Sequence, residues 1–140
     1  MNIQNSEKFY AQAQNFMPGG VNSPVRACRA VGRAPLFIDH AKGSKIYDVD
    51  GNEYIDYICS WGPNILGHAN ERVINAVTET CQRGLTFGTC HSGEIELAKL
   101  IKKHFPSMEM LRLVNSGTEA VMSAIRAARG YTKRDKIVKF

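Results

Sequence analysis

A strand–helix–strand pattern near the end of the sequence constrains the fold of this 140-residue chain more than any other feature. The apolar run MLRLV at 110–114 predicts a strand, an amphipathic helix follows it, and KIVKF at 136–140 predicts a second strand. Two strands joined by a helix within about thirty residues are typical of the βαβ crossover of a parallel sheet. The chain is therefore expected to have an α/β fold.

The second predicted strand reaches the last residue, Phe140. A parallel sheet of two strands cannot cover both of its faces, because parallel sheets are normally covered by helices on both sides. The pattern thus predicts that these residues are the amino-terminal part of a longer polypeptide.

The first half of the chain predicts a different arrangement. An amphipathic helix over 5–17 should stop at Pro18-Gly19-Gly20, and an irregular segment should extend to Ala34. The Asp-Gly step at 50–51 favours a tight turn between two strands, so an antiparallel meander is expected. Its strands are predicted at 36–39, 45–49 and 53–58, and helices are predicted at 71–83, begun by Asn70, and at 93–104.

Composition limits the classes of function. The chain has 18 Lys and Arg against 13 Asp and Glu, which gives a net charge of +5, but the basic residues are scattered and no stacking platform for bases accompanies them. No apolar run is long enough for a membrane span, and no secretory signal opens the sequence. The four cysteines are widely spaced, which predicts reduced thiols in a cytoplasmic protein and no metal site.

The segment Asn115-Ser116-Gly117-Thr118-Glu119 lies where the first predicted strand of the carboxyl-terminal half gives way to a helix. Unpaired N–H groups and the helix dipole favour a phosphate at such a point, and Gly117 would let it approach the backbone. On these residues alone, a simple helix cap by Ser116 or Thr118 is the more common explanation. The segment matches neither the phosphate loop of nucleoside triphosphatases nor the dinucleotide fingerprint.

Two further positions could carry chemistry. Ser23 and Arg26 stand together in the irregular segment, where an arginine beside a hydroxyl could bind a carboxylate, although a lone arginine is more often a surface residue. Trp61 is the only tryptophan of the chain, and a single tryptophan more often packs in a core or an interface than binds a ligand.

In combination, these segments resemble a known family. PGGVNSPVRA at 18–27, DVDGNEYIDYICSWGPNILGHA at 48–69, LTFG at 85–88 and the whole of 111–140 are similar to the class III aminotransferases of the fold type I pyridoxal-phosphate enzymes. The PGGVNSPVR loop points to the glutamate-1-semialdehyde aminomutases among them. The resemblance covers essentially the whole chain and implies the amino-terminal portion of a fold type I transferase.

The resemblance also implies an activity and a set of site residues. The activity is the conversion of glutamate-1-semialdehyde to 5-aminolevulinate in tetrapyrrole biosynthesis, with pyridoxal 5'-phosphate cycling through its pyridoxamine form. Ser116, Gly117 and Thr118 match the turn that binds the cofactor phosphate. Ser23, Arg26 and Trp61 match the substrate pocket, with Arg26 as the partner of the substrate carboxylate. No catalytic residue is assigned within the chain, because the Schiff-base lysine of the family lies beyond residue 140.

By the same resemblance, residues 1–60 should contribute to a small domain and residues 61–140 should begin the large cofactor-binding domain of a cytoplasmic homodimer. We expect neither nucleic acid nor a membrane as a partner. Two alternatives stay open: a class III aminotransferase with another substrate, and a non-catalytic basic binding module.

Overall fold

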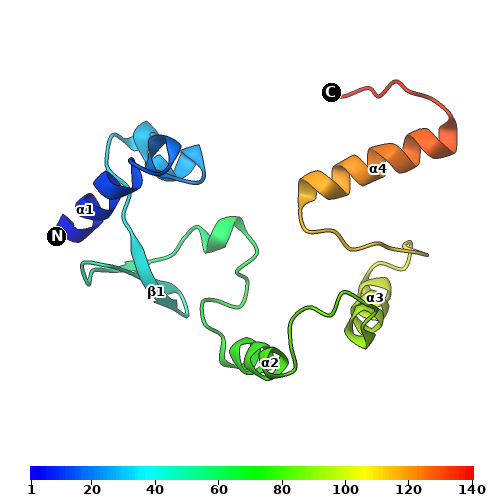
Figure 1. Cartoon of the computed structure of the whole chain (residues 1–140), viewed down its shortest axis with the longest axis horizontal. Helices are drawn as coiled ribbons and strands as arrows, with labels where there is room; N and C mark the ends of the chain where they lie inside the picture. Colours follow the sequence, from blue (N-terminus) through cyan, green and yellow to red (C-terminus); the bar gives the residue numbers. More distant parts are fainter. The chain divides into compact units, whose positions relative to one another are not determined.

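The computed structural model describes residues 1–140, which form two compact units, Met1–Leu85 and Thr86–Phe140. Figure 1 traces the chain from α1 and β1 in the first unit to α3 and α4 in the second. None of the helices has the length and the apolar run that a membrane span requires.

A three-stranded antiparallel sheet forms the centre of the first unit. Its strands are β1 (Ile38–Lys42), β2 (Lys45–Asp48) and β3 (Glu53–Ile55), paired in sequence order. The predicted meander is confirmed, although β1 begins later than expected and β3 ends earlier. The turn between β2 and β3 forms as predicted, with Gly51 at a φ of +82° and the Asp48 carboxylate accepting N–H bonds from Asp50 and Asn52.

The first helix, α1 (Gln4–Ala13), is held to this sheet by the same turn. The carboxylate of Asp50 accepts hydrogen bonds from the backbone N–H groups of Asn5 (2.8 Å) and Ser6 (2.9 Å). It therefore supplies from a distant loop the cap that Ile3, at the N-cap position, cannot provide.

The prediction that this helix extends to residue 17 is wrong. After Ala13, the N–H groups of Asn15 and Phe16 bond to carbonyls three residues back, a tighter spacing that ends an α-helix. Three short 3₁₀ turns then replace the predicted irregular segment: η1 (Pro18–Gly20), η2 (Pro24–Ala27) and η3 (Arg29–Val31).

The other predicted helices form within one residue of the expected starts. The first unit ends with a 3₁₀ turn, η4 (Cys59–Trp61), and α2 (Glu71–Gln82), whose Asn70 cap accepts N–H bonds from Arg72 and Val73. The second unit contains α3 (Ser92–His104), which stops before Pro106, and α4 (Gly117–Thr132).

The predicted strands at 110–114 and 136–140 do not form, so the parallel pair is a wrong prediction for this structure. Neither segment has a strand hydrogen-bonded to it. The physical reason is that a strand forms only beside another strand, and the elements of this unit are the two helices α3 and α4. Val138, in the second segment, is accordingly 78% exposed.

We expect the stability of the protein to fall in acid. Asp56 has a pKa below the ordinary value of 3.8 because its carboxylate bonds to the His68 ring. Burial raises the pKa of Asp48 and Asp50, but the hydrogen bonds that each accepts outweigh burial, so both also lie below 3.8. Because these carboxylates bind protons at a higher pH in the unfolded chain than in the folded one, the stabilisation is complete above about pH 5 and is lost as the pH falls through the folded pKa values.

The measurement is the thermal midpoint of the full-length protein between about pH 6 and pH 3, compared with Asp48→Asn. The variant should start from a lower midpoint and lose less of it on acidification. Parallel pH profiles for the two proteins would contradict the assignment of Asp48.

Candidate functional site

The turn before α4 is organised by a reciprocal pair of side chains. Ser116 is the N-cap, and its hydroxyl accepts a bond from the N–H of Glu119 (3.2 Å) and donates to the Glu119 carboxylate (3.1 Å). The same carboxylate accepts the N–H of Asn115 (2.9 Å). This arrangement is close to a capping box, so the cap that the residues alone favoured is present.

The cap leaves free the donors that an anion would use. Neither the backbone N–H groups of Gly117 and Thr118 nor the Thr118 hydroxyl has a hydrogen-bond partner. A Cβ atom placed on Gly117 would meet nothing within 4 Å, so the space in front of the backbone is open. Two free N–H groups, a hydroxyl and the positive end of a helix of 16 residues fit a phosphate group.

The sequence analysis includes Glu119 in this segment but assigns it no role. Its carboxylate, and not a ligand, fixes the positions of Asn115 and Ser116. The spacing Ser-x-x-Glu at 116–119 is the signal that could have identified it.

Ser23 and Arg26 lie on one turn of the first unit. Ser23 is the half-buried residue before η2, and its carbonyl accepts the N–H of Arg26 (2.9 Å). The guanidinium of Arg26 is exposed and forms no ion pair; beside it is a hollow of about 200 Å³ that Gly20 and Phe37 also line. An unpaired guanidinium at a hollow can bind a carboxylate in bidentate geometry.

Trp61 ends η4 in the loop between β3 and α2, and it is 70% exposed. Its φ of +65° follows two other positive values, at Cys59 and Ser60. The packing role that is usual for a lone tryptophan is not realised within this unit. No hydrogen bond or ion pair joins Trp61 to Ser23 or Arg26, and the turn at 115–119 belongs to the other unit.

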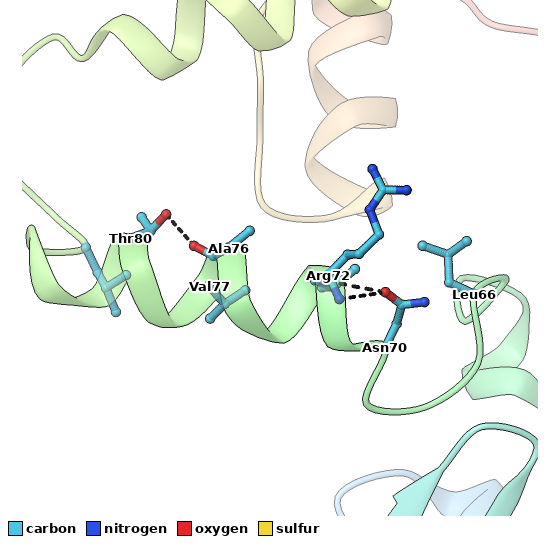
Figure 2. A pocket seen from close by; sticks show the side chains of 8 residues that line it. Leu66, Asn70, Arg72, Ala76, Val77 and Thr80 are labelled. Atoms are coloured by element: carbon cyan, nitrogen blue, oxygen red, sulfur yellow. Dashed lines mark hydrogen bonds between the residues drawn. The ribbon is translucent and has the colours of Figure 1, made fainter.

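A larger hollow of about 630 Å³ runs along α2, and Leu66 and Leu85 are among the residues that line it. Figure 2 shows Leu66 and the side chains of α2 that line the hollow. Its polar side chains are mostly engaged: Asn70 caps the helix, and the Thr80 hydroxyl donates to the Ala76 carbonyl. The hollow contains none of the predicted site residues, and its walls are largely apolar.

The Aminotransferase class-III family matches residues 27–140, which is most of the chain and includes both the η4 loop and the turn before α4. The chain belongs to this family. Among solved structures, a transaminase with PLP bound has a TM-score of 0.88 at 35% sequence identity, over 97% of this chain and 31% of that one. The fold is therefore that of the PLP-dependent transaminases over the length compared, as predicted.

Two curated relatives in this family are especially similar. The glutamate-1-semialdehyde 2,1-aminomutase of Clostridium novyi is 62% identical over 96% of this chain, and that of Thermodesulfovibrio yellowstonii is 63% identical over all of it. The chain spans about a third of the length of each, 31% and 33%. The roles of Ser23, Arg26, Trp61, Ser116, Gly117 and Thr118 remain predictions.

Proposed function

We propose that this chain contributes the cofactor-phosphate turn and part of the substrate pocket to an enzyme that isomerises glutamate-1-semialdehyde to 5-aminolevulinate. The observation that carries the proposal is the identity of 62–63%, over almost every residue of the chain, with proteins named glutamate-1-semialdehyde 2,1-aminomutase. It is supported by free anion-binding groups at two of the positions that the family resemblance assigns, the turn before α4 and Arg26.

The cofactor in this proposal is pyridoxal 5'-phosphate, alternating with its pyridoxamine form, which supplies the amine that is exchanged with the substrate. The N–H groups of Gly117 and Thr118 and the Thr118 hydroxyl hold its phosphate, because these donors have no partner within the chain. Ser116 keeps the turn in shape through its bonds with Glu119. The chain's contribution at this point is binding and orientation, which is the task of the protein in such enzymes.

The substrate is held through its carboxylate by Arg26, whose guanidinium has no competing carboxylate in the chain. Ser23 precedes Arg26 by three residues and supplies a hydroxyl on the same turn. Trp61 adds an exposed apolar surface that can exclude water from the reacting part of the substrate. No lysine of this chain is given the Schiff-base role.

Three features of the whole protein are part of the same proposal: a homodimer, a cytoplasmic location, and a division of this chain near residue 60 between a small domain and the large cofactor domain. A class III aminotransferase acting on another substrate is the second candidate. It is favoured by the similarity to an omega-transaminase from Sphaerobacter thermophilus, which is 35% identical with a TM-score of 0.86.

The deciding experiment supplies the full-length protein, loaded with pyridoxamine 5'-phosphate, with glutamate-1-semialdehyde and no other amino compound. We expect 5-aminolevulinate to accumulate over many turnovers, because an isomerisation returns the amine that it borrows. One equivalent of the diamine that forms when the aldehyde gains the cofactor's amine, without 5-aminolevulinate and with further turnover only when an amino donor is added, would identify a conventional aminotransferase and overturn the proposal.

A further inference from the structure

The loop between β3 and α2 is closed at its two ends by one hydrogen-bonded pair of side chains. Asp56 follows β3, His68 lies just before α2, and the His68 Nε2 and Asp56 Oδ2 atoms are 2.7 Å apart. We call this pair the Asp56–His68 clasp. The side chains are only 8% (Asp56) and 19% (His68) exposed, so water screens the pair far less than a surface ion pair.

The Asp56 carboxylate also holds the start of the loop. Its other oxygen accepts the N–H groups of Ile58 (2.8 Å) and Cys59 (3.1 Å), so one side chain bonds to the backbone at the start of η4 and to the far end of the loop. A charged acceptor with several donors fixes its partners more firmly than neutral bonds do.

The far end of the loop is fixed to the sheet as well. His68 exchanges two backbone hydrogen bonds with Gly43, in the turn between β1 and β2, at 2.8 and 2.9 Å. A Cβ atom on Gly67 would lie 2.9 Å from the Gly43 carbonyl oxygen, so the two backbones approach as closely as a glycine allows. The backbone of His68 is therefore held in place by the turn between β1 and β2.

Between these fixed ends the backbone adopts a strained conformation. Cys59, Ser60 and Trp61 have φ values of +50°, +53° and +65°, and Gly62 follows at +113°. Side-chain-bearing residues enter the left-handed region as single residues, not in runs, because the Cβ atom approaches the carbonyl. Such a run persists only when the surrounding structure holds it.

Apolar packing within the unit does not hold this loop. Tyr57 is 88% exposed, and Ile58, Trp61 and Ile65 are also exposed. Short-range backbone bonds lie within the run, from the N–H of Trp61 to the Ile58 carbonyl and from the N–H of Gly62 to the Cys59 carbonyl (3.0 Å each). The polar contacts of Asp56 and His68 connect the run to residues outside it, and Asp56 bonds directly to the N–H of Cys59.

We propose that the Asp56–His68 clasp positions Trp61 by holding the left-handed run at 59–62, so that Asp56 and His68 are positioning residues for substrate binding without touching the substrate. The consequence for catalysis rests on the proposed function, in which Trp61 lines the substrate pocket. The effect on the conformation of the loop does not depend on the proposed function, and the test measures the loop and the catalysis separately.

The test uses the full-length protein labelled with 5-fluorotryptophan, with the Trp61 fluorine resonance identified by its loss in Trp61→Phe. In Asp56→Asn and His68→Ala we expect this resonance to shift and broaden, and the KM for glutamate-1-semialdehyde to rise on the order of tenfold with a smaller change in kcat. His68→Gln retains a side-chain N–H donor and should restore part of both effects.

Asp39→Asn is the matched control. It breaks the other histidine–aspartate pair of the chain, His40 with Asp39 at 2.8 Å, whose side chains are both more than half exposed. It should change neither the resonance nor the KM. Melting curves identify any variant that fails to fold, and the remaining variants then decide the outcome.

An unchanged Trp61 resonance in folded Asp56→Asn and His68→Ala would overturn the clasp, whatever the kinetics show. A shifted resonance supports it. If Trp61→Phe itself leaves the KM unaltered while the clasp variants shift the resonance, the clasp stands and the substrate-binding role of Trp61 in the proposed function fails.

Discussion

Replacing Gly117 by valine is expected to weaken binding of pyridoxamine 5'-phosphate by about a hundredfold or more, while the protein stays folded. The fold should survive because a Cβ atom at this position meets nothing within 4 Å and Gly117 is the first residue of α4, outside the left-handed region. Binding should be lost because the new side chain fills the space through which a phosphate reaches the free N–H groups of Gly117 and Thr118.

The measurement is calorimetric titration of the full-length protein, freed of cofactor, with pyridoxamine 5'-phosphate, which forms no bond to a lysine and so reports the non-covalent contacts alone. Gly130→Val is the matched control, because Gly130 lies on the same helix with open space at its Cβ position. It should bind the cofactor as the unaltered protein does. Equal affinities for Gly117→Val and Gly130→Val would mean that the phosphate is bound elsewhere.

A second variant measures how much the Thr118 hydroxyl alone contributes to cofactor binding. Thr118→Val keeps the shape of the side chain and the backbone N–H but removes the unpaired hydroxyl, so it should weaken binding on the order of tenfold. The result for Gly117→Val should exceed it, since that change obstructs backbone donors as well.

The features of the fold that could be predicted are those decided by a few neighbouring residues. The Asp-Gly turn placed the hairpin between β2 and β3, and Asn70 placed the start of α2, because each of these signals acts through hydrogen bonds within four residues. The start of α4 was predictable for the same reason, from Ser116.

The features that could not be predicted depend on partners distant in sequence. The apolar runs at 110–114 and 136–140 have strand-like composition, yet a strand exists only when another strand supplies its hydrogen bonds. The end of α1 at Ala13 could not be predicted either. The helical spacing of apolar residues continues to Phe16, but Phe16 is 85% exposed in the structure, so packing does not extend the helix to it.

The candidate site divides in the same way. The donors of the turn before α4 could be predicted from the local sequence. The cap that Asp50 makes on α1 could not, because Asp50 lies more than forty residues from the N–H groups that it accepts and no sequence spacing relates the two. The Asp56–His68 clasp was missed because the two residues, twelve apart, lie on opposite ends of an irregular loop. Their approach depends on the backbone pairing of His68 with Gly43, which only the folded sheet provides.

Replacing Arg26 by alanine is expected to lower kcat/KM for glutamate-1-semialdehyde by about a hundredfold, mostly through KM. The guanidinium is exposed beside a hollow and has no carboxylate partner in the chain, so the substrate carboxylate is its partner in the proposed complex. Since the contact is made before and during the reaction alike, its loss weakens ground-state and transition-state binding together, which raises KM more than it lowers kcat.

Arg26→Lys separates charge from geometry. Lysine retains the positive charge but cannot form the two parallel hydrogen bonds of a guanidinium, so it should recover only part of the lost kcat/KM. Arg29→Ala removes an equivalent charge three residues along, on η3, and should change kcat/KM by no more than about threefold. If Arg26→Ala and Arg29→Ala lowered kcat/KM equally, the effect would come from the general positive charge of this segment, and Arg26 would not be the carboxylate ligand.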